Sequence, residues 1–593
     1  MAEYKEPITT HEGASESVPG SFDAFARLRS SRWLSPMCAV LALLPIIAFL
    51  CLIGFPKYAM TPDDQAQALY ASGRIFGFGP TSLMLYTLYP VSAPLSMLYQ
   101  AMPSVPWYPS FLLILTWISF AIALDTAVRS RLRNTAAACS LIVLISLEVL
   151  SLFYFTYTIT AFLGTAAGLM LLINHAAFTR ENRLRVSDVC GVLLIALGYS
   201  LRPESGTAAI AIFAPFALWV LIRNRCLGSI LRGIAAIACV GLCATVGQIA
   251  YDTTPGWEGF SDYLAAGRLV MDSPVMSVES IQAAAPELSE NDVKTMYNWD
   301  GNDIGYFSTD LFQKAGKAVS RYNLANFLDS FTAKTTYMLI GLAVGIAILT
   351  WMIARDIRGD KATFVLAFGI AFMLMASYGI IIMRARPRLH VVIPLATIAF
   401  FALMSFAHAP ASTASGKRFS PARGNRQSWL TVGATVAVCA VVLAGFYLKT
   451  VKPSRSLFTH PTVLAMTEYV EDHPDTLFYS RTTPILFHKY DALSFETWKQ
   501  PENLLAVGSW QSGAAPWRAY CERKGLDPEM TLLELLNRDD MLAVLAPKSA
   551  KYLKTYLEER TGRPVERTLL EDLGNGVTDP TQHVCVYRFT YAD

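Results

Sequence analysis

Residues 34–55 read LSPMCAVLALLPIIAFLCLIGF, and residues 61–65 just beyond them read TPDDQ. The apolar run is long enough to cross a bilayer as a helix. No small-residue cleavage site follows it, so we interpret it as an uncleaved anchor rather than a signal peptide. The polar tail before it ends in Arg27, Arg29 and Arg32, which predicts a cytoplasmic N-terminus. A pair of aspartates therefore follows the first span directly on its outer side.

The rest of the chain has the composition of a membrane protein. Of its 593 residues 53% are hydrophobic and only 16% are charged, whereas an average soluble protein has about 25% charged residues. The net charge of +3 is too small to indicate a nucleic-acid partner. Further apolar runs lie near 109–127, 135–155, 157–177, 187–201, 206–222, 233–250, 336–354, 362–383, 388–408 and 429–448. We therefore predict a polytopic α-helical membrane protein with about eleven transmembrane helices.

The placement of basic residues supports this count. Alternate loops are rich in arginine and lysine, as the positive-inside rule requires of cytoplasmic loops. These loops carry Arg129, Arg131 and Arg133; Arg180, Arg183 and Arg185; Arg223, Arg225 and Arg232; Arg355, Arg358 and Lys361; and Lys417, Arg418, Arg423 and Arg426. The odd number of spans predicts an extracytoplasmic C-terminus in the cell membrane.

The spans divide the chain into a cytoplasmic tail at 1–33, a membrane domain at 34–449 and an extracytoplasmic domain at 450–593. Within the membrane domain, long outside segments are predicted at 56–108 and 251–333. The part of the first at 80–108 is apolar but interrupted by prolines, so we expect a broken helix in the outer interface.

The C-terminal domain is normally charged and reads as a small α/β fold. We predict helices at Thr462–Glu471 and Lys548–Arg560 and strands at Thr476–Tyr479, Met541–Leu545 and Val584–Phe589. Cys521 and Cys585 both lie in this domain, either as a disulfide, which the compartment permits, or as two buried thiols.

Asp63 and Asp64 are the first candidate catalytic residues. Thr61 as N-cap, Pro62 in the first turn and two acids after it are typical of a helix N-terminus, so capping is one interpretation. The other is a general base at the membrane surface that takes a proton from a sugar hydroxyl. Because adjacent helical residues point about 100° apart, the two acids need not share one role.

Arg384, Arg386 and Arg388, with His390 just beyond, form the second candidate. They lie between spans nine and ten on the predicted outside, against the positive-inside trend. A phosphate group favours such a cluster, because guanidinium groups bind phosphate bidentately. Anionic headgroups or acids of the outer domains are the alternative partners.

Two further charged positions lie on or in spans. Arg202 and Glu204 flank Pro203 at the outer end of span five, as a surface ion pair or as a wall of the same outer cavity. Glu148 lies inside span three, nearer its outer end. An ionisable residue within a span indicates a functional site by default, and a hydrogen-bonded neutral carboxyl is the alternative.

The second outside segment contains Trp299, Asp300, Asp303 and Tyr306 within WDGNDIGY. Glycine, asparagine and aspartate are typical of turns. The same cluster offers the carboxylates and aromatic rings that hold a sugar, while its spacing does not match the calcium loop of the EF-hand.

In layout the chain resembles the GT-C superfamily of membrane glycosyltransferases. The matching features are the cytoplasmic N-terminus, the acid pair in the first outside loop, the juxtamembrane helix after it and the outer C-terminal domain. The stretch from Asp63 to Tyr108, with Leu98-Tyr99 and Pro106-Trp107-Tyr108, is similar to GtrII-type members that modify polysaccharides, as are the turn at Arg202 and the arginines before span ten.

The resemblance implies that Asp63 or Asp64 is the catalytic base and that the donor is a sugar on a polyprenyl phosphate. The acceptor would be an extracytoplasmic glycan or a protein, and a single displacement would invert the anomeric configuration. Arg384, Arg386, Arg388 and Arg202 would bind the donor phosphate, and Glu204, Glu148, Trp299, Asp300, Asp303, Tyr306 and His390 would contact substrate. A divalent metal, Mg²⁺ or Mn²⁺, is left open, because no second acidic motif is clear unless Asp300 and Asp303 provide it.

Other functions stay open at this point. A transporter or flippase of lipid-linked glycans would also carry charges outside and within the membrane, and a scaffold would use its tail to bind wall components. A polymerase or ligase of glycan chains is a close neighbour within the enzyme class. The sequence has no internal repeat of the kind that many transporters show.

Overall fold

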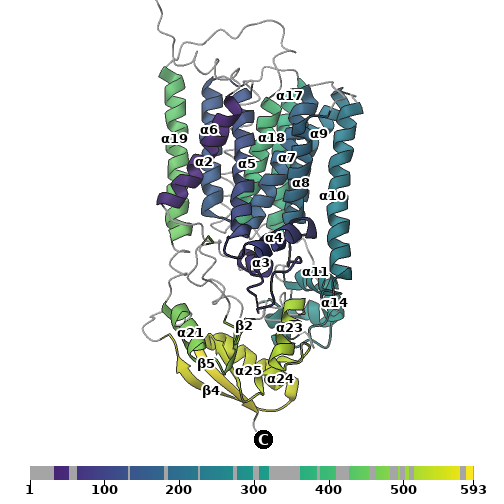
Figure 1. Cartoon of the computed structure of the whole chain (residues 1–593), viewed down its shortest axis with the longest axis vertical. Coiled ribbons are helices and arrows are strands. Elements are labelled where there is room, and N and C mark those ends of the chain that lie inside the picture. The colour runs from purple at the N-terminus through teal and green to yellow at the C-terminus, as the bar shows by residue number, and fades with distance from the viewer. Residues whose placement is uncertain are drawn as a thin grey trace, which may run out of the picture.

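A bundle of long apolar helices forms the larger part of the molecule (Figure 1). The computed structural model describes residues 33–591 apart from 53–62, 76, 131, 133, 179–183, 225–226, 272–276, 298–302, 304–305, 319–360, 384–387, 409–425, 453–460, 481–491, 494–500, 507–512 and 575–582. The bundle consists of α2 (Leu34–Leu52), α5 (Trp107–Arg129), α6 (Asn134–Phe153), α7 (Tyr157–Phe178), α8 (Val186–Leu201), α9 (Pro203–Asn224), α10 (Leu227–Thr253), α17 (Lys361–Met383), α18 (Leu389–Ala407) and α19 (Arg426–Phe446).

The described chain has the helices of a multi-pass membrane protein. Within it, eight helices are long and apolar enough to cross a membrane, and two shorter apolar helices, Val186–Leu201 and Phe368–Met383, accompany them. Ten of the predicted spans thus coincide with bundle helices. The predicted span at 336–354 lies outside the described residues, so the count of eleven stays a prediction.

Helices α7 and α18 form the centre of the bundle. Of the residues in their apolar windows 89% and 83% are buried, compared with 6% for α19, which lies at the edge (Figure 1). A helix that is apolar all round is stable only in a protein core or in lipid. The difference in burial therefore distinguishes core helices from lipid-facing ones of the same composition.

The short helix α8 packs directly against α7 through glycines. A Cβ atom on Gly168 of α7 would lie 2.4 Å from the carbonyl oxygen of Gly191, and one on Gly198 of α8 would lie 2.4 Å from the backbone nitrogen of Thr165. Small residues at such positions let two membrane helices approach closely. This contact explains how a helix of 16 residues holds its place in the bundle.

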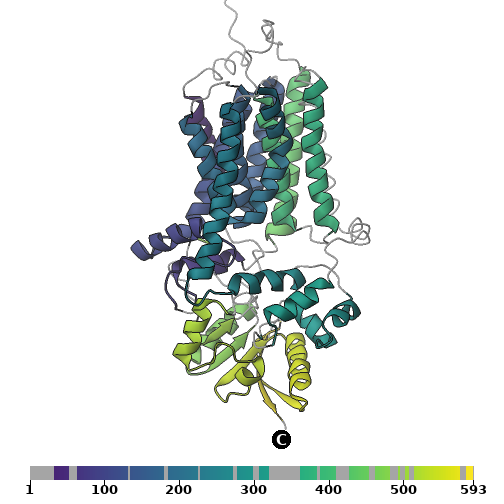
Figure 2. The same cartoon turned by 90° about the vertical axis from the view of Figure 1, so that its right-hand side faces the viewer.

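One end of the bundle carries all the described non-spanning helices and the sheet, and we call it the domain end. It contains α3 (Asp63–Ser72), α4 (Tyr89–Ala101), α11 (Phe260–Met271), α12 (Val278–Ala284), α13 (Glu290–Tyr297) and α14 (Thr309–Lys317). Helices α11 and α14 lie between the bundle and the C-terminal sheet (Figures 1 and 2). The described parts of the segments predicted to lie outside thus share one end of the bundle, as the alternation of charged loops requires. The face of the membrane that this end occupies stays a prediction.

The proline-rich segment at 80–108 forms no bundle helix along most of its length. Its helix α4 runs across the domain end, next to α3 (Figure 1). Met97 and Met102 of this segment are exposed, while Val91, Leu95 and Tyr99 are buried. An apolar outer side beside the bundle fits the interfacial position predicted for this segment.

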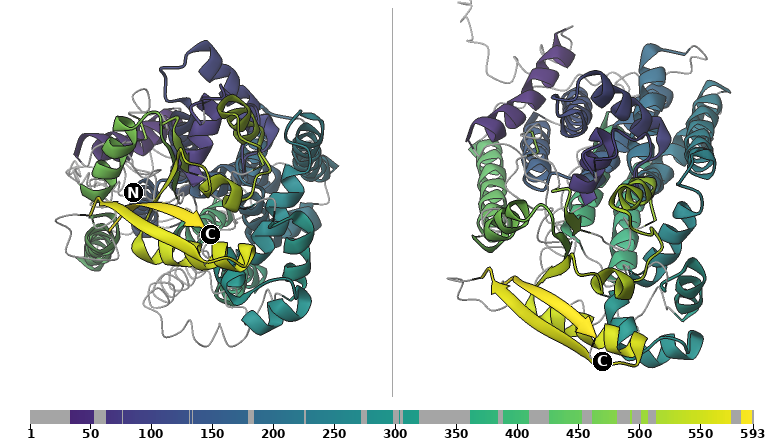
Figure 3. Two further views of the ribbon diagram at one scale, coloured as in Figure 1. Left: turned by 90° about the horizontal axis from the view of Figure 1, so that it is seen from below. Right: turned by 60° about the horizontal axis from the view of Figure 1, so that its bottom comes forward.

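The C-terminal region forms an α/β domain around a five-stranded sheet of order β2-β1-β3-β5-β4. Its elements are α21 (Pro461–Asp472), β1 (Leu477–Ser480), β2 (Leu504–Ala506), α23 (Ala515–Lys524), α24 (Leu532–Leu536), β3 (Met541–Leu545), α25 (Pro547–Thr561), β4 (Val565–Asp572) and β5 (Cys585–Tyr591). Strand β1 pairs in parallel with β2 and β3, and β5 pairs antiparallel with β3 and β4. Seen from below, β4 and β5 lie beside α25 (Figure 3).

The structure confirms each predicted element of this domain and adds others. Strand β4 was not predicted because six consecutive residues of it, Glu566–Glu571, are exposed, so its sequence lacks the apolar alternation of a half-buried strand. Cys521 on α23 and Cys585 on β5 are buried free thiols. Of the two states that the sequence allowed for these cysteines, the structure has the unpaired one.

Candidate active site

The two predicted catalytic acids begin helix α3 at the domain end. Carboxylates in the first turn of a helix are stabilised by the partial positive charge of its N-terminus. The predicted capping residues Thr61 and Pro62 lie outside the described residues. Asp64 is fully buried, whereas Asp63 is partly exposed. Both acids therefore lie in the first turn of α3, and they differ in how far each side chain is buried.

Asp64 joins α3 to two bundle helices. Its Oδ1 accepts hydrogen bonds from the backbone N–H of Tyr157 at 2.7 Å and from the Tyr108 hydroxyl at 3.2 Å. Its Oδ2 has no hydrogen-bond partner among the described residues. Burial raises the pKa of the Asp64 carboxyl well above its usual range, more than these two hydrogen bonds lower it. Burial therefore works against the charged form of Asp64, whose hydrogen bonds hold α3 on α5 and α7.

Arg202 lies beside the acid pair, where α8 ends. Its Nη1 donates to the Tyr157 hydroxyl at 3.0 Å and also to the Thr158 hydroxyl. Its Nε lies 3.8 Å from Oε2 of Glu204. Arg202 interacts electrostatically with Asp63 as well. The structure thus brings the predicted residues Arg202 and Glu204 to the predicted acids.

A second arginine, Arg268 of α11, completes this cluster. Its Nη2 lies 2.9 Å from Oε1 of Glu204, and its guanidinium carbon lies 5.3 Å from the ring centroid of Tyr86. The Tyr86 ring stacks on Tyr157, with centroids 6.3 Å apart and planes at 17°. No sequence signal pointed to Arg268, which is one basic residue on an ordinary amphipathic helix. We call Asp63, Asp64, Tyr157, Arg202, Glu204 and Arg268 the acid–arginine cluster.

The predicted arginines before span ten lie only partly within the described residues. Arg388 is the exposed N-cap of α18, while Arg384 and Arg386 fall outside the described residues. The ring of His390 stacks on Tyr154, with centroids 6.3 Å apart. Since Tyr154 precedes α7 by three residues, the start of α18 lies at the same end of the bundle as the acid–arginine cluster.

Glu148 is buried within α6. Neither carboxylate oxygen has a hydrogen-bond partner among the described residues, so the hydrogen-bonded alternative for this residue has no support there. An unpaired carboxylate is costly in a membrane interior, which favours a neutral Glu148.

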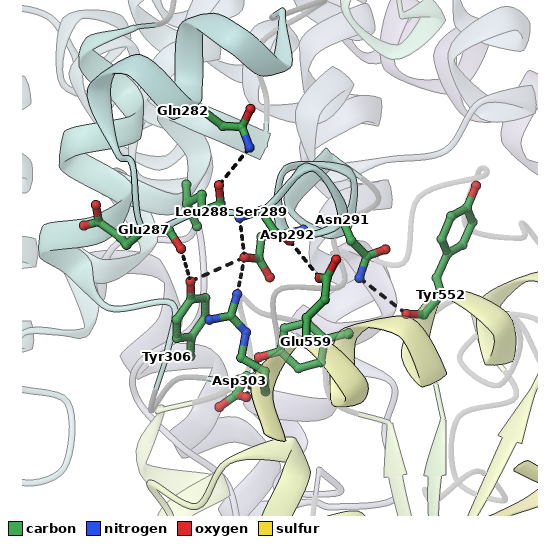
Figure 4. A network of polar contacts seen from close by, with 12 residues as sticks. Gln282, Glu287, Leu288, Ser289, Asn291, Asp292, Asp303, Tyr306, Tyr552 and Glu559 are labelled. Carbon is green, nitrogen blue, oxygen red and sulfur yellow. Dashed lines mark hydrogen bonds and ion pairs between the residues drawn. The ribbon is translucent and has the colours of Figure 1, made fainter. Parts of the chain in front are cut away.

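The predicted sugar-binding turn takes part in a polar network between the segment 251–333 and α25 (Figure 4). Asp303 is buried, and its Oδ2 accepts a hydrogen bond of 2.6 Å from the Tyr556 hydroxyl. Burial raises the pKa of Asp303. The Tyr306 ring faces the guanidinium of Arg560, whose carbon lies 3.5 Å from the ring centroid. Trp299 and Asp300 lie outside the described residues.

Arg560 is the centre of this network. It forms an ion pair with the buried Asp292 of α13, whose Oδ2 also accepts from the backbone N–H of Ser289 at 2.8 Å. The Ser289 hydroxyl donates to Glu559 at 2.8 Å (Figure 4). These contacts fasten the C-terminal domain to the segment that carries α11 and Arg268.

No protein-family model and no curated protein matches this chain. Two crystal structures are similar to it, both of ArnT from Cupriavidus metallidurans, one bound to undecaprenyl phosphate and one in the apo state. The similarity covers 93% of this chain and 97% of each ArnT chain. The sequence identities are 13% and 12%, and the TM-scores are 0.38 and 0.36.

The described residues contain no group of three or more His, Cys, Asp or Glu side chains placed to hold a metal ion. Asp63 and Glu204 nevertheless offer oxygen ligands of the kind that Mg²⁺ and Mn²⁺ prefer. Arg202 and Arg268 already neutralise Glu204. The sequence left a divalent metal open, with Asp300 and Asp303 as the acids that could provide its motif, and the structure does not test it.

Removal of the Arg560 side chain should loosen the C-terminal domain. Arg560→Ala leaves the carboxylate of Asp292 buried without its cation, and loss of one partner of a buried pair costs about 3–5 kcal/mol. We expect a lower midpoint of thermal unfolding and faster proteolysis near the sheet domain. Lys554→Ala on the same helix is the control, since its pair with Glu558 is exposed and such pairs contribute about 0–1 kcal/mol. Equal midpoints for the two variants would show that Arg560 does not fasten the domain.

Proposed function

We propose that this chain is a membrane glycosyltransferase that moves a sugar from a polyprenyl-phosphate donor to a glycan or protein acceptor at the domain end of the bundle. The observation that carries the proposal is the acid–arginine cluster. Asp63, a partly exposed carboxylate, interacts electrostatically with Arg202, and Arg202 and Arg268 both contact Glu204, at the end of the central helix α7 that lies at the domain end. When a hydroxyl displaces a lipid phosphate, the reaction requires a general base for the hydroxyl proton and cations that bind the leaving phosphate.

Asp63 is the proposed base. It is partly exposed and can reach an acceptor hydroxyl, whereas Asp64 is buried and its Oδ1 accepts two hydrogen bonds. Asp63 takes the hydroxyl proton while the hydroxyl oxygen attacks the anomeric carbon. The bond from that carbon to the phosphate oxygen breaks, and its electron pair leaves with the polyprenyl phosphate. A single displacement of this kind inverts the anomeric configuration.

Arg202 and Arg268 are the proposed ligands of the donor phosphate. Both hold Glu204 between them, so their guanidinium groups are fixed before the donor binds. Fixed cations stabilise the negative charge that develops on the leaving phosphate. Arg384, Arg386 and Arg388 stay predicted ligands of the same phosphate, with His390 beside them. Glu148, deeper in α6, stays a predicted substrate contact.

Asp303 and Tyr306 have a different proposed role. Their contacts with Tyr556 and Arg560 support domain docking rather than direct sugar binding. Trp299 and Asp300 remain predicted substrate contacts. The C-terminal domain would then present the acceptor to the acid–arginine cluster.

The proposal is tested with the full chain reconstituted in liposomes. The probes are radiolabelled hexoses and pentoses on polyprenyl phosphate, and the readout is label on an extracytoplasmic glycan fraction. Parallel samples with EDTA and with added Mg²⁺ or Mn²⁺ test the metal separately. In a deletion strain we expect loss of one side-branch sugar with normal backbone export. Accumulation of the intact lipid-linked precursor in the cytoplasmic leaflet would indicate a flippase instead.

A further inference from the structure

Tyr157, the first residue of α7, contacts both halves of the acid–arginine cluster. Its backbone N–H donates to Asp64 at 2.7 Å, and its hydroxyl accepts from Arg202 at 3.0 Å. Its ring stacks on Tyr86, over which Arg268 lies. The side chain is 1% exposed. Tyr157 therefore links the acids on α3 to Arg202, which follows α8, and to Arg268, which lies on α11.

The helix that carries Tyr157, α7, is deeply buried in the bundle and therefore holds this link in place. Among the candidate membrane spans, α7 has the highest buried share, at 89%. Its first turn also supplies the Thr158 hydroxyl, which accepts from the same Nη1 of Arg202. Two consecutive hydroxyl groups thus set where the guanidinium lies, and the backbone of the same turn sets where α3 lies.

We propose that Tyr157 is a positioning residue whose hydroxyl fixes Arg202 at the separation from Asp63 that sugar transfer requires. This inference rests on the proposed function and assigns a role to a residue outside the reacting groups. The rate of a reaction between groups that an enzyme holds in place is sensitive to a displacement of about 1 Å. A residue that positions one of these groups therefore influences the rate without touching substrate.

The charges around Asp63 determine how the loss of this hydroxyl should appear. The titratable groups near Asp63 and Tyr157 come from α3, the segment before α4, α5, the junction of α8 with α9, and α11. They are Asp64, Tyr86, Tyr108, Arg202, Glu204 and Arg268. Of the two cations among these groups, Arg202 is the one that Tyr157 holds. If its guanidinium becomes mobile, Asp63 loses part of a nearby positive charge and is protonated at higher pH.

Tyr157→Phe tests the proposal because it removes only the hydroxyl and keeps the ring and the backbone N–H. A hydrogen bond to a charged group is typically worth about a tenfold change in rate or more when it acts in the transition state. We therefore expect kcat to fall about tenfold with a smaller change in donor KM. We also expect the acidic limb of the kcat/KM profile to move to higher pH.

Tyr378→Phe is the matched control. Tyr378 is a buried tyrosine of the bundle whose hydroxyl donates to the carbonyl oxygen of Val392 at 3.1 Å. We expect that variant to change the melting temperature by a similar amount and to leave the pH profile in place. If Tyr157→Phe does not fold, Thr158→Val removes the other hydroxyl that holds Arg202 and should shift the same limb.

The outcomes separate this inference from the proposed function. A wild-type chain without transferase activity would contradict the proposed function itself. An active wild type together with an unshifted pH profile and normal kcat in Tyr157→Phe would overturn the positioning role alone. A lower melting temperature with an unshifted profile would overturn it too, since that is the signature of a merely structural tyrosine.

Discussion

Asp63→Asn is expected to lower kcat for sugar transfer by about 10²–10⁴-fold, the range typical of a general base, while Asp64→Asn retains most of the activity. Asp63 is the partly exposed member of the pair, and an amide in its place cannot take the acceptor proton. Asp64 is buried, which raises the pKa of its carboxyl, and an amide shares the shape of that carboxyl. The oxygen of that amide can still accept from the Tyr157 N–H and the Tyr108 hydroxyl.

The measurement is transfer from the labelled donor by each purified variant in liposomes, with its melting temperature recorded alongside. Asp64→Ala serves as the contrasting variant, since it removes the anchor of α3 and should lower the melting temperature. Full transfer by both Asn variants would exclude the base assignment altogether. An inactive, folded Asp64→Asn beside an active Asp63→Asn would reverse it.

Arg202→Ala should lower kcat by about 10²–10³-fold, the effect of removing one fixed group that stabilises transition-state charge. The Arg202 side chain is 18% exposed, and its guanidinium contacts Tyr157, Thr158 and Glu204, so it is organised before the donor arrives. Arg202→Lys should recover only part of the loss, because an ammonium group cannot bind phosphate bidentately.

Arg388→Ala distinguishes the two basic regions at the domain end. Arg388 is exposed and lies at the start of α18, whereas Arg202 follows α8 beside Tyr157. We expect a loss of transfer smaller than that of Arg202→Ala, and it should appear mainly in donor KM. If Arg388→Ala has the larger effect on kcat, the phosphate site belongs to the arginines before span ten, and the assignment of Arg202 is wrong.

Some residues of the cluster were recognisable in the sequence because their signals are local. Asp63 and Asp64 follow an apolar span directly, and Arg202 and Glu204 flank a proline at the end of another. A charge at the end of a span stands out against the apolar residues around it, whatever the tertiary structure. Arg268 had no such contrast, since α11 lies in a segment of mixed composition and reaches Glu204 only through the fold.

The roles within the cluster were not recognisable. Asp63 and Asp64 have the same chemistry and adjacent positions, and their difference arises from how α3 lies on α5 and α7. Tyr157 reads in the sequence as one more aromatic residue at a span boundary. Asp303 and Tyr306 read in the sequence as a turn or as sugar contacts, and neither interpretation identified their partners Tyr556 and Arg560, which lie about 250 residues later in the chain.

The sequence by itself determined the membrane class, the places of the described spans and the segments that share one end of the bundle. These follow from hydropathy and from the sorting of basic residues, which depend on the solvent that each short segment meets rather than on its neighbours in space. Only the tertiary structure decided which acid is buried, which arginines meet Glu204 and which tyrosine joins them. Those properties depend on contacts between segments far apart in the chain, and no local pattern encodes such contacts.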